Sequence, residues 1–167
     1  METRNYFTWA VLFVSLILAG CSASKGLTRE ERIAQETALR EAIEKRAFVV
    51  AVDKAFPVGE GMRVLTSPYS LTVNGNEVKS YLPFFGRAYS VPYGGGAGLI
   101  FDSTITDYQL LFDKKGKATI EFKTKSKDDQ FVYNVSIFVN GSASVNVMSV
   151  NRQSISFTGK ASPQEKN

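Results

Sequence analysis

Hydrophobic residues recur at every second position over most of the chain after residue 48. In the segment 118–125, apolar Ala118, Ile120 and Phe122 alternate with polar side chains, and the segment 131–139 repeats this period. Such one-sided alternation between short turns is typical of antiparallel strands that cover a core with one face. The other expected strands span 48–52, 62–66, 69–73, 77–82, 99–105, 107–112, 142–150 and 154–160.

Turn signals separate these segments. Asn74-Gly75 between two strands is the strongest short hairpin signal, and Gly116 lies in a lysine-rich turn. About eight to ten short strands in a meander are expected to curl into a barrel or a sandwich. The sequence therefore predicts a mainly β (α+β) fold.

The segment 28–47 has a different pattern and predicts one N-terminal helix. Thr28 and Glu31 have the spacing of a capping box, and opposite charges follow at i,i+4 spacing. The apolar stripe is thin and consists of Ile33, Leu39, Ile43 and Ala47. We expect such a helix to pack against or beside the sheet rather than to form its core.

The first twenty residues have the composition of a secretory signal. Residues 7–20 are apolar apart from Thr8 and Ser15, which is too short for the ~20 residues that span a bilayer. Leu18-Ala19-Gly20-Cys21 resembles the lipobox of bacterial lipoproteins, which implies cleavage between Gly20 and Cys21 and a diacylglycerol plus an N-acyl chain, such as palmitate, on Cys21. Cys21 is the sole cysteine, so it forms no disulfide within the chain.

The expected organisation follows from these patterns. Residues 1–20 are a signal peptide and 21–27 a lipidated tether. Residues 28–161 form a single domain, with a helix at 28–47 and a β-rich part at 48–161, and 162–167 are a disordered tail. The residues after Cys21 lack the aspartate that resembles an inner-membrane retention signal. We therefore expect a lipoprotein on the periplasmic face of the outer membrane.

Composition excludes several kinds of chemistry. The chain has no histidine and one cysteine, which rules out Ser-His-Asp and Cys-His catalysis and zinc sites built from those residues. Its net charge of +4 is interspersed rather than blocked, which does not suggest a nucleic-acid partner. Asp102 and Asp107 flank an expected turn, where they either cap the turn or form the carboxylate pair of a small hydrolase. We expect no metal and no cofactor apart from the lipid.

The segment from Tyr81 to Gly98 is the most unusual part of the chain. Its aromatic residues, arginine and glycines are the candidate binding residues: Tyr81, Phe84, Phe85, Arg87, Tyr89, Tyr93, Gly94, Gly95 and Gly96. The glycines are not followed by the Lys-Ser/Thr and helix of a phosphate-binding loop, so we expect a loop or lid. In one interpretation, Phe84 or Phe85 plugs one end of the β-core. In the other, the aromatic rings and Arg87 form a platform for a sugar or apolar ligand.

The same segment resembles a known signature. Leu82 to Tyr89 (LPFFGRAY), with Pro92-Tyr93 after it, is similar to the LPYFGRAY signature of an uncharacterised bacterial lipoprotein family, the domain of unknown function 4251. Phe84 stands where that signature has a tyrosine. Matching positions on either side, over roughly 46–159, are Phe48, Asp53, Asp107, Tyr108, Asn151, Arg152, Ile155, Phe157 and Gly159. The resemblance implies a lipid-anchored envelope protein of Gram-negative anaerobes and no particular activity.

Three functions stay open. The first is a non-enzymatic module that binds a glycan, an apolar ligand or an envelope protein. A pocket lined by Arg87 and Tyr89 would favour this function. The second is a structural or assembly lipoprotein that interacts through a bare sheet edge. The third is a small hydrolase with two carboxylates that converge in a cleft.

Overall fold

A computed structural model describes residues 27–89, 98–127 and 129–164 of the chain. The predicted signal peptide, Cys21, Tyr93, the glycines at 94–96 and the end of the tail lie outside these residues. The elements are the helix α2 (Arg29–Glu44) and the strands β1 (Ala47–Pro57), β2 (Arg63–Val64), β3 (Ser70–Asn74), β4 (Glu77–Pro83), β5 (Gly98–Phe112), β6 (Ala118–Lys125), β7 (Gln130–Ile137), β8 (Ser142–Ser149) and β9 (Ile155–Pro163).

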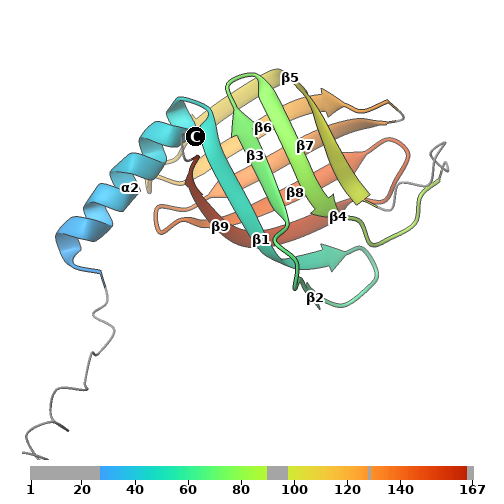
Figure 1. Ribbon diagram of the computed structural model, residues 1–167, viewed down its shortest axis with the longest axis horizontal. Coiled ribbons are helices and arrows are strands. Elements are labelled where there is room, and N and C mark those ends of the chain that lie inside the picture. The colour runs from blue at the N-terminus through green and yellow to red at the C-terminus, as the bar shows by residue number, and fades with distance from the viewer. Residues whose placement is uncertain (1–26, 90–97, 128, 165–167) are drawn as a thin grey trace, which may run out of the picture. The chain divides into compact units, whose positions relative to one another are not determined.

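The strands form a closed antiparallel barrel (Figure 1). Each strand from β3 to β8 pairs with the next one along the chain, β1 pairs with β3, and the additional pairing of β1 with β9 closes the ring. The short β2 lies outside the ring, beside the last part of β1. The predicted mainly β meander with one N-terminal helix is confirmed, and the barrel is realised rather than the sandwich.

The barrel has two ends because the connections of a meander alternate. The end that we call the helix end carries the junction of α2 with β1 and the turns after β3, β5 and β7. The opposite end, which we call the distal end, carries the connections after β1, β4, β6 and β8.

The turn predicted between 105 and 107 is wrong. Residues 98–112 form one long strand, β5, which pairs with β4 over its first part and with β6 over its second. The register shifts between Thr106 and Gln109, and Asp107 has a φ of 52°. A β-bulge with one residue in the left-handed region bends a strand without ending it. Asp102 and Asp107 therefore do not flank a turn.

Other bounds also differ from the expected ones. The helix ends at Glu44 instead of 47, because Arg46 has a φ of 54° and Ala47 already pairs in β1. At the other terminus, β9 continues to Pro163, so Ser162 and Pro163 belong to the sheet rather than to a disordered tail. The strand expected at 62–66 is reduced to the two residues of β2.

Aromatic rings fill the inside of the barrel. Phe122 and Tyr133 lie stacked with ring centroids 5.0 Å apart, Tyr108 stacks on Phe122, and the ring of Phe131 lies tilted by 58° against Tyr133. The hydroxyl of Tyr133 donates a hydrogen bond to Ser80 Oγ, which donates in turn to the carbonyl of Leu99. The buried polar groups of this network are thereby paired, as a stable core requires.

The helix contributes to the core with its second half. Leu39 and Ile43 are buried in the same cluster as the barrel residues, and the guanidinium of Arg40 lies 4.2 Å from the ring centroid of Phe112. At its start, the predicted capping box is confirmed: the Thr28 amide donates to the Glu31 carboxylate, and the Glu31 amide donates to Thr28 Oγ1. In the part of the chain that the structure describes, no helix is both long and apolar enough to cross a membrane.

Candidate functional site

The described part of the predicted binding segment covers the distal end of the barrel. Phe84 and Phe85 are half-buried and pack against the core. The guanidinium of Arg152 lies 5.4 Å from the ring centroid of Phe84, and that of Arg63 lies 4.7 Å from the ring centroid of Phe85. These two rings occupy the position that the plug interpretation expects.

The backbone after Phe85 is tied to the turn between β8 and β9. The amide of Arg87 donates to Gln153 Oε1, and the amide of Gln153 donates back to the carbonyl of Arg87 at 3.0 Å. The amide of Tyr89 donates to the carbonyl of Asn151. The side chains of Arg87 and Tyr89 are exposed, so this part of the segment presents two polar-tipped side chains from a pinned backbone.

Beneath this segment lies a buried ion pair that the sequence did not reveal. Arg152 Nε is 3.6 Å from Asp129 Oδ2, and both side chains are almost completely buried. Asp129 also accepts hydrogen bonds from Ser149 Oγ and from the amide of Gln130, while Arg152 Nη1 donates to the carbonyl of Gly98. The pair joins three connections of the distal end, which indicates a structural role.

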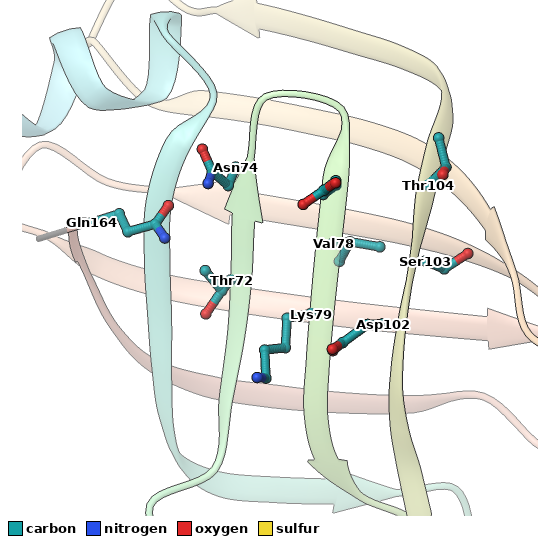
Figure 2. Close-up of a pocket in the computed structure, with 9 residues that line it drawn as sticks. Thr72, Asn74, Val78, Lys79, Asp102, Ser103, Thr104 and Gln164 are labelled. Atoms are coloured by element: carbon teal, nitrogen blue, oxygen red, sulfur yellow. The ribbon is translucent and has the colours of Figure 1, made fainter. Parts of the chain in front are cut away.

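A separate groove lies on the outer wall of the barrel over β3, β4 and β5 (Figure 2). Its volume is about 380 Å³, within the range of small-molecule sites. Its lining is almost wholly polar: Thr72, Asn74, Glu77, Val78, Lys79, Asp102, Ser103, Thr104 and Gln164. Rigid, paired strands carry nearly all of these side chains, so the strand register fixes their spacing.

The register arranges the groove as two cross-strand rows. Thr72 pairs with Lys79, which pairs with Asp102. In the neighbouring row, Glu77 lies between Asn74 and Thr104. Directly opposite residues in an antiparallel sheet have Cβ atoms only about 5 Å apart, so each row brings side chains from three strands within reach of one small ligand.

The polar groups of the groove are available to a ligand. Within the described residues, the charged groups of Glu77, Lys79 and Asp102 form no ion pair and no hydrogen bond, and the same holds for the side chains of Asn74 and Gln164. Ammonium and amide donors thus stand beside carboxylate acceptors on one face. Mixed donors and acceptors suit a neutral ligand whose hydroxyls both give and accept hydrogen bonds.

The outer face continues from the groove towards the distal end with an aromatic row. Tyr81 follows Lys79 by two positions on β4 and pairs with Ser70 and Ile100. Two residues along a strand correspond to about 7 Å, and both side chains point to the same face. The ring of Tyr81 lies against that of Tyr69, with centroids 5.4 Å apart. Among the predicted binding residues that the structure describes, Tyr81 is therefore the one beside the groove.

The predicted carboxylate pair does not converge. Asp102 lies opposite Lys79 in the strand register, on the side of β5 that faces β4. Asp107 lies on the side that faces β6, where it forms an ion pair with Lys123 at 3.0 Å. Glu77 does share the groove with Asp102, but both side chains are exposed. A general acid of a glycosidase is held in an apolar, water-poor pocket, which this open face does not provide.

The unusual titratable groups of the barrel lie away from the groove. Burial raises the pKa of Tyr133 well above its ordinary value, and it raises the pKa of Tyr108 to about 12. Both tyrosines belong to the interior stack. The described residues contain no group of three or more acidic, histidine or cysteine side chains that could hold a metal ion.

Comparison with known proteins places the fold. A family model described as a domain of unknown function (DUF4251) matches residues 30–161. A crystal structure of a DUF4251 family protein from Bacteroides eggerthii is similar over 78% of this chain and 88% of that chain, with a TM-score of 0.63 and 19% sequence identity. No curated protein matches the chain.

Proposed function

Because the chain belongs to the DUF4251 family, whose description states no activity, we propose a function from its own residues: a lipid-anchored cell-envelope protein whose barrel is a non-enzymatic, glycan-binding module. The groove over β3, β4 and β5 carries this proposal. It joins unpaired donors and acceptors on a rigid sheet and has an aromatic ring one row away. This combination of fixed polar groups and a stacking face is typical of sites for hydroxyl-rich ligands.

Each part of the groove has a role in this proposal. Lys79 and the amides of Asn74 and Gln164 donate to sugar oxygens, while Asp102 and Glu77 accept from sugar hydroxyls. A glycan of more than one residue extends from the groove onto the ring of Tyr81. Hydrogen bonds to charged groups contribute about 1.5–3 kcal/mol each, so Lys79, Asp102 and Glu77 carry most of the affinity.

The closed barrel weakens the assembly alternative. In the part of the chain that the structure describes, β2 has an unpaired side over its two residues, which is shorter than the row of free amides and carbonyls that a partner strand needs. The two halves of β5 each pair on one side, the first with β4 and the second with β6, so neither side of this strand is free over its whole length. A binding face on the barrel wall is therefore favoured over an interaction through an edge.

A matched pair of double variants tests the glycan site. Lys79→Met with Asp102→Asn should lower binding to an oligosaccharide array at least tenfold, because each variant removes a charged hydrogen-bonding group. Lys123→Met with Asp107→Asn changes the same residue types on the neighbouring strands β5 and β6, and should leave binding unchanged. Equal binding by wild type and the groove variant would refute the site. Release of new reducing ends by wild type would instead support the hydrolase.

The anchor is tested separately. Wild type should incorporate labelled palmitate and partition into detergent, and Cys21→Ser should do neither, because the thiol is the attachment point that the lipobox resemblance implies. Protease treatment of intact cells should spare the protein if it faces the periplasm. A Cys21→Ser variant that is still labelled would contradict the anchor without affecting the glycan site.

A further inference from the structure

Two neighbouring turns at the helix end carry both lysines and exposed apolar side chains. The turn between β5 and β6 and the turn between β7 and β8 touch, since a Cβ on Gly116 would lie 3.3 Å from Val139 Cγ2. We call this surface the helix-end patch. It consists of Leu111, Lys114, Lys115, Lys117, Phe138 and Val139.

The apolar members of the patch are open to solvent. Leu111 is 69% exposed, Phe138 48% and Val139 41%. The strand register places them on one outer surface, because Leu111 pairs with Thr119, and Lys117 and Phe138 lie just beyond the paired ends of β6 and β7. The ammonium of Lys117 is 5.9 Å from the ring centroid of Phe138. Large apolar side chains exposed beside basic ones are characteristic of interaction surfaces.

The lysine turn is held in one conformation by Asp113. Its Oδ1 accepts hydrogen bonds from the amides of Lys115 and Lys117, at 2.8 and 2.9 Å, and its carbonyl accepts from the amide of Gly116. The hydrogen bond from the Lys117 amide is the main reason why the pKa of Asp113 is below its ordinary value. The carboxylate is thereby occupied by backbone amides of its own turn.

Asp113 is the acidic side chain of this turn, and the charges of Lys117 and Lys115 also help to lower its pKa. Among the described residues, none of the ammonium groups of Lys114, Lys115 and Lys117 forms an ion pair. With Asp113 counted, the turn has a net charge of +2 (three lysines against one aspartate). Its charge complements an anionic surface, and its apolar side chains suit a surface with an accessible hydrocarbon layer beneath.

From this chemistry we propose that the helix-end patch docks on the anionic lipid surface of the membrane, with Phe138 and Val139 at the acyl-chain boundary and the three lysines at the headgroups. The choice of lipid over an acidic protein rests on the proposed anchor at Cys21. Six residues, 21–26, separate Leu27 from the lipid end of the tether and span at most about 20 Å. The helix that follows joins the barrel at this same end.

Docking in this way orients the barrel. The distal end, with Arg87 and Tyr89, then points away from the membrane, and the strands β3, β4 and β5 that carry the groove run from the membrane side towards the distal end. A lipid anchor at the end of a tether does not by itself fix the orientation of the barrel, whereas basic and apolar contacts at one end of the barrel do.

The test uses the mature chain from residue 21 without acylation and with Cys21→Ser, which contains every core residue from Leu39 to Ala161. Phe138→Trp adds the sole indole of this chain, because Trp9 lies in the predicted signal. Its fluorescence should shift to the blue and be quenched by brominated acyl chains with phosphatidylglycerol vesicles. With phosphatidylcholine vesicles it should stay unchanged.

Lysine variants decide whether the patch is responsible. Each lysine near an anionic surface contributes about 1 kcal/mol, so replacing Lys114, Lys115 and Lys117 by serine should weaken vesicle binding roughly a hundredfold. Replacing Lys123, Lys125 and Lys127 by serine changes the net charge equally, but towards the distal end of β6. This control should keep its affinity. An absent blue shift, or an equal loss in both triple variants, would overturn the proposal and leave the anchor and the glycan site unaffected.

Discussion

Removing the buried carboxylate of Asp129 should destabilise the protein far more than removing the exposed carboxylate of Asp107, which pairs with Lys123. Asp129 pairs with Arg152 at 3.6 Å, and their side chains are 2% and 9% exposed. Lys123 and Asp107 form a shorter pair, at 3.0 Å, but their side chains are 54% and 63% exposed. If the distance between the charged atoms determined how much a pair adds to the free energy of unfolding, the exposed pair would add more. If burial determines it, the buried pair will add more.

The magnitude follows from what Asp129→Ala leaves behind. The guanidinium of Arg152 stays buried with a single hydrogen bond to the carbonyl of Gly98 and the face of Phe84. Leaving one buried charge without its partner costs about 3–5 kcal/mol. For a domain of this size that corresponds to a Tm lower by roughly 10–20 °C. Asp107→Ala should cost less than about 1 kcal/mol, since exposed pairs contribute little.

Thermal and urea unfolding of four proteins would measure the effect: wild type, Asp129→Ala, Arg152→Met and the double variant. The double variant should be less destabilised than the sum of the single ones, because it leaves no unpaired charge in the distal end. If Asp129→Ala costs no more than Asp107→Ala, or if the two single effects simply add, the buried pair does not hold the distal end together.

Two further stability predictions follow. Gly159→Ala should prevent folding or cost more than about 3 kcal/mol, since its Cβ would lie 1.9 Å from the carbonyl oxygen of Ala51, whereas Gly61→Ala, with nothing within 4 Å, should be neutral in urea melts. Tyr108→Phe should be neutral or slightly stabilising at neutral pH, because the buried hydroxyl has no hydrogen-bond partner in the described chain. With the folded pKa of Tyr108 raised to about 12, the unfolded chain loses this proton first, so the unfolding free energy falls from about pH 10 to 12, and less steeply in Tyr108→Phe.

The sequence predicted correctly those strands that have one apolar and one polar face. The segment 118–125 was assigned with its observed bounds, because apolar and polar residues alternate there without interruption. The long β5 was divided in two, since Asp107 reads as a turn residue and a bulge leaves no other trace in a single sequence. The end of β9 was placed too early because Pro163, a residue that disfavours central strand positions, occupies the last position of the strand.

The groove was not predicted because its residues come from three strands and the C-terminal segment. Thr72 and Lys79 look like ordinary solvated positions in the sequence, and Asp102 was considered only together with Asp107. The register of β3, β4 and β5 aligns the three residues. Arg152 follows the expected strand 142–150 and matches a position of the family signature, but nothing near it in the sequence pointed to Asp129 as a buried partner. Both the groove and the Asp129–Arg152 pair form only when strands that are distant in the sequence become neighbours. An alternation of apolar and polar residues does not show which strands become neighbours.

The candidate binding segment and the groove differ in whether their aromatic rings are accessible to a ligand. The rings of Phe84 and Phe85 are covered by Arg152 and Arg63, so they are not free to stack on a sugar. Tyr81 is partly exposed on the outer wall, next to Lys79. The two regions consist of different residues, so residue-resolved measurements can distinguish them.

The most direct test of glycan binding is a titration of the isotope-labelled mature chain with an array-identified oligosaccharide, followed by amide chemical shifts. Binding in the groove should give saturable shifts that cluster at residues 72–81 and 100–104, on β3, β4 and β5. Shifts confined to residues 84–89 and 151–153 would place the ligand at the distal end instead. That result, or no shift at saturating glycan, would contradict the proposed site.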